Sequence, residues 1–239
     1  MSRRMTAEAK VNRVRWMRAQ FPGSIRQIGK QLQRASFTAD TDQGFVVDRV
    51  RDEFLEARYF ERIAFQESVT DPFGNTFVVE RLDFREVDFT LTKTFPELEL
   101  RMPPRALRGF TSGLLKASGF SMELSSHKVV LSEWIRALER DLRTKISVRS
   151  LVASGVELTG GAAARVAITG PSDVRTALAE LIPANRYDLD TIQIDFPYER
   201  NSQRIILASD SSVRYGERTP PEILESLRKA FEATGRTAR

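Results

Sequence analysis

The sequence has no cysteine and only one histidine, His127, among its 239 residues. A chain without thiols can form neither a disulfide framework nor a thiolate zinc site. A lone histidine, with no second histidine or cysteine to join it, cannot build a zinc centre or a Cys-His catalytic pair. The missing cysteines fit a reducing compartment, so we expect a cytoplasmic protein, and we predict no catalytic residue, no cofactor and no metal.

Long apolar runs and phosphate-binding loops are missing as well. No segment approaches the roughly 18 apolar residues that a membrane span requires, and residues 1–15 alternate Arg and Lys with short apolar stretches, unlike a signal peptide. The pair Gly160-Gly161 lacks the third glycine of a dinucleotide fingerprint, and no P-loop pattern occurs. We therefore expect no membrane span and no nucleotide hydrolysis by a P-loop.

Positive charge is present in excess, but only at one end of the chain. The net charge is +5, and 30 of the 37 basic residues are Arg. Residues 1–34 contain nine Lys or Arg and one acid, a local net charge of +8, whereas the other 205 residues contain 28 basic and 31 acidic groups, a net of −3. Such asymmetry is typical of a segment that binds phosphates or an acidic protein surface, although a GC-rich coding bias would also enrich Arg.

The basic N-terminal segment is predicted to form two helices. Over residues 7–20, apolar side chains such as Val14 and Met17 recur at helical spacing, while Trp16 projects away from them. Pro22-Gly23 ends this helix, and Ser24 followed by Gln27 is a capping box that starts a second one. In the second helix the apolar stripe consists of Ile25, Ile28 and Leu32, and the opposite side carries a row of cations spaced four apart, Arg26, Lys30 and Arg34.

Residues 24–32 resemble the first half of a helix-turn-helix. Ile25, Ile28 and Leu32 would be its core positions and Gly29 its small residue. The resemblance covers about a dozen residues and departs from the motif at Gln33, where a glycine normally opens the turn. Residues 35–44 are also too rich in Thr and Asp for a recognition helix.

Strands and helices alternate in the rest of the chain. The turn signal at residues 71–75, Asp-Pro-Phe-Gly-Asn, predicts a hairpin, and residues 87–91 and 98–102 show the period-two pattern of half-buried strands. Residues 45–55 fit either a helix or a strand. Helical spacing predicts helices at 105–117, 131–142, after Pro171 and at 219–235, with strand pairs at 146–152 and 165–168 and at 191–196 and 204–207.

Together these elements predict an α+β protein. A basic two-helix N-terminal segment is followed by an antiparallel β-sheet region and then by a C-terminal α/β region with two strand-strand-helix units. The expected domains are a basic helical arm at residues 1–40, a mainly antiparallel β region at 41–125 and an α+β region at 126–239. The last two are also compatible with one continuous domain.

Two classes of function fit these patterns. The first is a non-enzymatic protein that binds nucleic acid, DNA or RNA, through phosphate contacts of its basic N-terminal helices. The second is a protein-interaction or assembly subunit whose N-terminal helices dock on a partner, either an acidic protein surface or a second copy in a homo-oligomer. The residues predicted to bind nucleic acid are Arg13, Arg15, Arg18, Arg26, Lys30, Arg34 and Trp16.

A magnesium-dependent nuclease ranks third. Glu86 and Asp88 would share one face of a strand, with Asp83 and Lys93 nearby in the sequence. Any solvent-exposed strand face shows the same alternation of acids with apolar residues, so the pattern is a weak indication of a metal site.

Overall fold

The structure is a computed structural model that describes residues 11–158, 161–182 and 186–235. The chain divides into two compact units. Unit 2 consists of Trp16–Ser125, and unit 1 consists of residues 11–15 together with the described residues from Ser126 onward. Each unit has its own sheet and its own helices.

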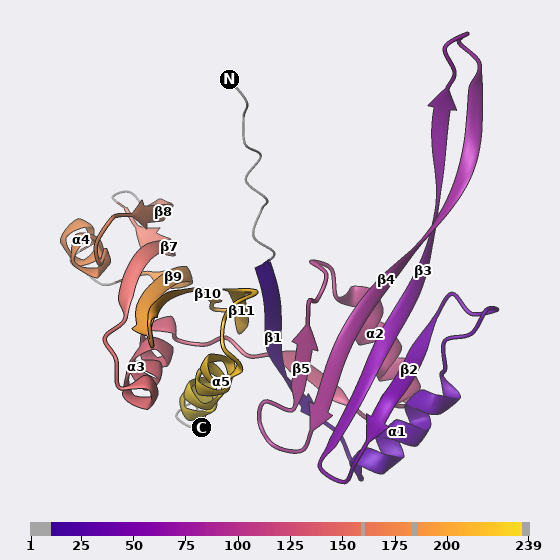
Figure 1. The fold of residues 1–239 in the computed structure, drawn as a ribbon, viewed down its shortest axis with the longest axis horizontal. Helices are drawn as coiled ribbons and strands as arrows, with labels where there is room; N and C mark the ends of the chain where they lie inside the picture. The colour runs from indigo at the N-terminus through magenta and orange to yellow at the C-terminus, as the bar shows by residue number, and fades with distance from the viewer. Residues whose placement is uncertain (1–10, 159–160, 183–185, 236–239) are drawn as a thin grey trace. The chain divides into compact units, whose positions relative to one another are not determined.

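The dominant structure in the described chain is antiparallel β-sheet, with eleven strands and only five helices (Figure 1). The predicted layout of a two-helix N-terminal segment, a sheet region and a C-terminal α/β region is therefore wrong. Two errors account for this: residues 11–20 are not helical, and the C-terminal strands form one continuous sheet.

Strand β1 (Val11–Gln20) lies where the first helix was predicted. Its first half pairs antiparallel with β11 (Ser212–Gly216), with Val14 opposite Val213. Trp16 and Met17 are both buried although neighbouring side chains point to opposite faces of a strand, so β1 is covered on both sides. A strand buried on both faces loses the period-two pattern, and the three-residue spacing of Val14 and Met17 then imitates a helix. The part of the predicted helix before residue 11 lies outside the described residues.

Unit 2 is an antiparallel sheet in the order β2-β3-β4-β5-β1, covered by helices α1 and α2. The undecided segment 45–55 proves to be the end of one strand and the start of the next. The predicted turn at residues 71–75 is confirmed, because it joins the two longest strands. The bounds are α1 Ile25–Arg34, β2 Gln43–Val50, β3 Phe54–Thr70, β4 Thr76–Thr92, β5 Leu98–Arg101, α2 Arg108–Ala117 and β6 Glu123–Ser126.

Helix α1 begins where the capping box predicted. The Ser24 hydroxyl accepts a hydrogen bond from the Gln27 backbone N–H at 3.2 Å, and the Gln27 side-chain oxygen accepts one from the Ser24 N–H at 2.7 Å. The predicted apolar stripe, Ile25, Ile28 and Leu32, is at most 1% exposed because it packs in the core of unit 2. No second helix follows α1 in the helix-turn-helix manner, since the next element is strand β2.

Aromatic rings fill the core between the helices and the sheet of unit 2. Tyr59 of β3 packs against Phe45 at 5.2 Å between ring centroids and against Phe110 of α2 at 5.8 Å. The Tyr59 hydroxyl donates a hydrogen bond to Gln43 Oε1 at 2.8 Å. Burial raises the pKa of Tyr59 to about 12, because the phenolate would lose its hydration.

Unit 1 is a second antiparallel sheet with its own helices. Its strand order starts with the first half of β1 and continues β11-β10-β9-β7-β8. The predicted helix at 131–142 is confirmed, and its Trp134 indole donates a hydrogen bond to the Leu227 carbonyl of α5 at 3.0 Å. The short strand β11 was missed, so β9, β10 and β11 form a run of three strands in place of a strand-strand-helix unit. The bounds are α3 Leu131–Leu142, β7 Ser147–Glu157, β8 Ala163–Thr169, α4 Arg175–Leu181, β9 Asp188–Tyr198, β10 Asn201–Ala208 and α5 Pro221–Gly235.

Among the described residues, no helix is both long and apolar enough to span a membrane.

Candidate interaction surfaces

The predicted cationic row on α1 is present, and we call it the α1 row: Arg26, Lys30 and Arg34. All three side chains are exposed on the helix face opposite the core. The Arg26 guanidinium is bound by the Asp52 carboxylate at 2.5 Å, so its charge is already partly neutralised. In the described part of the chain, no ion pair engages Lys30 or Arg34.

The other predicted cations lie on β1, which is a strand and offers no helical row. In unit 1, Arg15 forms an ion pair with Asp210 at 3.6 Å with only 18% of its side chain exposed, and Arg13 lies opposite Arg214 in the register of β1 and β11. In unit 2, Arg18 is partly buried, with its guanidinium carbon 4.7 Å from the centroid of the Phe95 ring.

Trp16 is buried, with 2% of its surface exposed. Its indole N–H donates a hydrogen bond to Glu99 Oε2 at 3.0 Å. The folded protein therefore offers no exposed indole face at this position on which a base could stack. Of the seven predicted residues, the structure brings only the α1 row together on one surface.

Lys116 of α2 extends this basic surface and was missed in the sequence. It lines, together with Arg34, Gln31, Gln43 and Tyr59, a cavity of about 530 Å³ in unit 2. Arg34 and Lys116 lie in the last turns of α1 and α2, where a cation stabilises the negative end of the helix dipole. Part of this basic charge thus has a structural role within the helices themselves.

One of the acids considered for a metal site, Glu86, forms an ion pair with an arginine. The Arg58 guanidinium lies within 3.5 Å of Glu86 Oε1 and 3.0 Å of Asp48 Oδ1, and Arg58 is opposite Asp88 in the register of β3 and β4. The described ranges contain no group of three or more His, Cys, Asp or Glu residues placed to hold a metal ion. The geometry gives the nuclease hypothesis no support.

A two-stranded extension of β3 and β4 is the most distinctive surface of unit 2. Strand β2 pairs with β3 only as far as Glu61, and β5 pairs with β4 only from Asp88 on, whereas β3 and β4 continue to pair with each other out to Thr70 and Thr76. We call residues 62–84 the ribbon. At 3.3 Å per residue each of its strands is about 30 Å long, and the ribbon projects beyond the rest of unit 2 (Figure 1).

Large apolar side chains are exposed along the whole ribbon. Cross-strand partners point to the same face, so one face carries the pair Val69 and Phe77, and the other carries Val78 and Leu82. Eight of the fourteen large apolar residues found exposed in the described chain belong to the ribbon. They are Phe65 (43%), Val69 (47%), Phe73 (89%), Phe77 (55%), Val78 (61%), Val79 (45%), Leu82 (63%) and Phe84 (51%).

The turn at the tip of the ribbon is held by Asp71. Its carboxylate accepts hydrogen bonds from the Phe73 N–H at 2.8 Å and from the Asn75 N–H and side-chain amide, both at 2.9 Å. The Asn75 bonds in particular lower the pKa of Asp71, because they favour its charged form. Gly74 supplies the positive φ of +87° that the turn requires. These bonds fix the backbone under Phe73, the most exposed of the apolar side chains.

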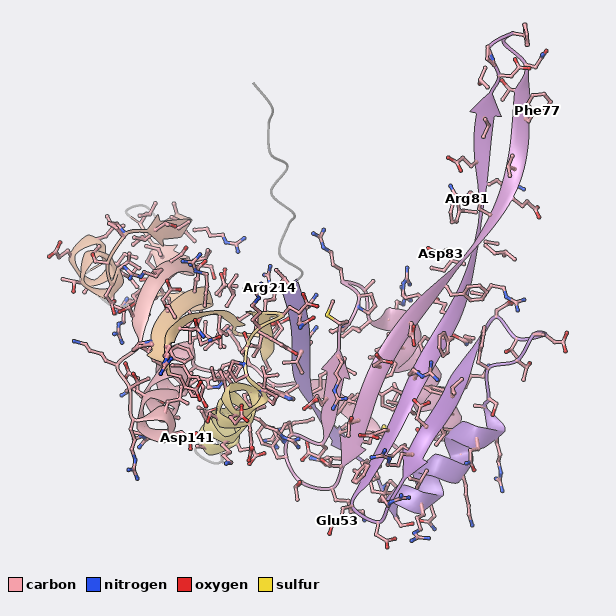
Figure 2. The ribbon with its side chains drawn as sticks, viewed as in Figure 1. Glu53, Phe77, Arg81, Asp83, Asp141 and Arg214 are labelled. Atoms are coloured by element: carbon pink, nitrogen blue, oxygen red, sulfur yellow. The ribbon has the colours of Figure 1, made fainter. Side chains whose placement is uncertain are left out.

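The charges of the ribbon are mainly acidic. It contains four carboxylates, Glu67, Asp71, Glu80 and Asp83, and two guanidinium groups, Arg62 and Arg81. Arg81 forms an ion pair with Glu67 at 2.9 Å and lies 5.8 Å from the centroid of the Phe65 ring. Figure 2 shows Phe77, Arg81 and Asp83 at successive heights along β4.

Comparison of the chain with known protein families and with curated proteins found no match.

Proposed function

We propose that this chain is an assembly protein that binds another protein through the apolar surface of its ribbon. The observation that carries the proposal is the set of eight large apolar side chains exposed on one two-stranded projection. Large exposed apolar surfaces are uncommon on monomers and mark interaction sites. Isolated two-stranded hairpins are also marginally stable in water, so a partner that covers the ribbon stabilises it.

The net negative charge of the ribbon favours a protein over nucleic acid or lipid as its partner. Four carboxylates against two guanidinium groups give the ribbon a net charge of −2. Nucleic acid and the anionic lipids of a membrane surface both attract cations, so an acidic ribbon is repelled by either. A protein surface with apolar side chains fits the ribbon without this cost.

The surface that binds the partner in this proposal differs from the one predicted in the sequence. The apolar stripe of α1, Ile25, Ile28 and Leu32, is buried in the core of unit 2. It cannot dock on a partner while unit 2 is folded. The ribbon takes its place as the binding element.

The proposal is tested by photo-cross-linking in cells. A p-benzoylphenylalanine residue replaces Phe73 or Val79 in the ribbon, and Glu53, an exposed residue of unit 2 that lies far from the ribbon (Figure 2), is the control position. We expect a discrete protein adduct from Phe73 and Val79 but not from Glu53, and weakening of that adduct when Phe77→Ser is added. Equal labelling from all three positions, or no protein adduct from the ribbon, contradicts the proposal.

Nucleic-acid binding through the α1 row is the second candidate function. The observation that favours it is the exposure of Lys30 and Arg34 on one helix face, beside Lys116 in the neighbouring helix. Three cations make a smaller phosphate-binding surface than the sequence predicted, so the expected affinity is low and strongly dependent on salt.

This second candidate is tested with two variants that change the net charge equally. Lys30→Gln with Arg34→Gln removes the α1 row charges, and Lys145→Gln with Arg200→Gln removes two exposed cations of unit 1. If the α1 row contacts phosphates, only the first variant weakens binding to a DNA or RNA duplex and lowers the slope of log K against log salt by about 2. Equal effects of both variants contradict a specific role of the row.

A further inference from the structure

We infer that the protein bound by the ribbon is a second copy of this chain, and that the two ribbons pack on each other in a closed dimer. This inference rests on the proposed function and adds the identity of the partner. It is carried by the size of the apolar surface, by its charge pattern and by the rigidity of the ribbon.

The exposed apolar area of the ribbon is divided between its two faces and its tip. Aromatic side chains offer about 150–250 Å² each, and the eight ribbon side chains are 43–89% exposed, so together they leave about 800 Å² of surface per copy. Phe65, Val69, Phe77 and Val79 share one face and supply roughly half of this area. Two ribbons that cover each other with this face form an interface below the standard size, which is typical of weak, reversible association.

The ribbon has a net charge of −2, so its charge pattern favours contact between two copies only near its middle. In a two-fold dimer the same patch meets itself, so a patch of one charge sign would repel its copy. Near the middle of the ribbon, Glu67 and Arg81 neutralise each other at 2.9 Å within one copy. Two copies can therefore approach there without an unbalanced charge, and the surrounding Phe65, Phe77 and Val79 are apolar.

The main chain of the ribbon provides further contacts. In the described pairings, the residues of β3 from Ile63 to Thr70 pair only with β4, and those of β4 from Thr76 to Val87 pair only with β3. Such open edges present backbone N–H and C=O groups that a strand from another chain can pair with. The turn held by Asp71 reduces the entropy lost on binding, since the tip is already ordered in the single copy.

Sedimentation velocity on the full chain tests the oligomer over a range of concentrations. One copy has a mass of 27.1 kDa, so a dimer has a mass of 2 × 27.1 = 54.2 kDa. Phe77→Ser with Leu82→Ser removes one apolar side chain from each face of the ribbon, and Phe120→Ser with Leu181→Ser removes two similarly exposed side chains elsewhere. We expect the ribbon variant to dimerise about 100-fold more weakly than the wild type, and the control to dimerise normally.

A cysteine cross-link identifies the surface directly, because the natural chain has no thiol to interfere. Val79 lies near the middle of the ribbon, opposite Glu67, where a ribbon crossing on a two-fold axis meets its own copy. Val79→Cys should form a disulfide-linked dimer on oxidation, whereas Phe120→Cys should remain monomeric under denaturing conditions. Circular dichroism and thermal unfolding check that each variant is folded.

The outcomes separate this inference from the proposed function. A wild-type monomer at all concentrations, together with a cellular ribbon adduct to a different protein, overturns the second copy as partner but leaves the proposed function standing. A dimer that is insensitive to Phe77→Ser with Leu82→Ser overturns the inference as well. A monomer without any ribbon adduct overturns both.

Discussion

Replacement of Trp16 tests whether β1 is a structural strand or a surface element. The indole is 2% exposed in unit 2, and its N–H donates to Glu99 Oε2 at 3.0 Å. A tryptophan that stacked on a nucleic acid would be exposed, and its removal would leave the stability of the protein almost unchanged. A buried tryptophan with a hydrogen-bonded indole must stabilise unit 2.

The magnitude follows from two contributions. Trp16→Ala removes the whole buried ring, a change that lowers the free energy of unfolding by about 3–5 kcal/mol in protein cores. Trp16→Phe keeps most of the apolar volume but removes the donor to Glu99. Hydrogen bonds to charged groups contribute about 1.5–3 kcal/mol, and the Glu99 side chain is still bonded to Arg101 at 3.1 Å and 16% exposed. We therefore expect a loss of about 1–2 kcal/mol for Trp16→Phe.

Urea unfolding followed by circular dichroism measures both variants, with each transition fitted separately because the chain has two units. In a Trp134→Phe background Trp16 is the only tryptophan, so its fluorescence reports on this site alone. We expect blue-shifted emission, weak quenching by acrylamide and no change when a DNA duplex is added. A loss below about 1 kcal/mol for Trp16→Ala, or strong quenching by DNA, would refute a buried structural role.

Three further predictions concern unit 2. The pKa of Tyr59 is raised to about 12 in the folded state and is about 10 when unfolded, so its stabilising contribution is complete below pH 10 and is lost as the pH rises through 12. The stability difference between wild type and Tyr59→Phe should therefore shrink over this range in urea titrations. Gly113→Ala should destabilise unit 2 by about 1–3 kcal/mol, because the new Cβ would lie 2.8 Å from the Tyr59 ring, and a raised melting temperature would contradict this packing. Ser24→Ala should cost about 1 kcal/mol by removing the capping box of α1, whereas Ser24→Asp should retain most of the stability.

Local signals in the sequence identified those elements whose ends are marked by specific residues. Ser24 and Gln27 located the start of α1, and the Asp-Pro-Phe-Gly-Asn sequence located the ribbon turn, because both structures depend on contacts between residues close in sequence. The apolar stripe of α1 was also read correctly as a buried face.

Elements that depend on distant partners could not be predicted in the same way. β1 is a strand because β11, some 200 residues later, pairs with it, and burial on both faces hides its period-two pattern. The length of β3 and β4 beyond β2 and β5 was also invisible in the sequence, since alternation continues through the ribbon whether or not a core covers it. Exposed apolar residues such as Leu82 and Val78 look like core residues until the structure shows that more than half of each side chain is exposed.

The α1 row is basic and the ribbon is acidic, so their opposite charges favour a second mode of assembly. An experiment must distinguish it from the ribbon–ribbon dimer. If the basic row of one copy bound the acidic ribbon of the next, each copy would use two different surfaces, and such head-to-tail contacts can grow beyond two copies. Salt distinguishes the two arrangements, because charges on exposed surfaces are largely screened at an ionic strength of about 0.1 M and above, whereas burial of apolar side chains is not. A ribbon–ribbon dimer uses the same surface on both copies, so its mass stops at two chains and its affinity persists in salt. Species larger than two chains that dissociate in salt, and that disappear with Lys30→Gln and Arg34→Gln, would instead place the contact between the α1 row and the ribbon.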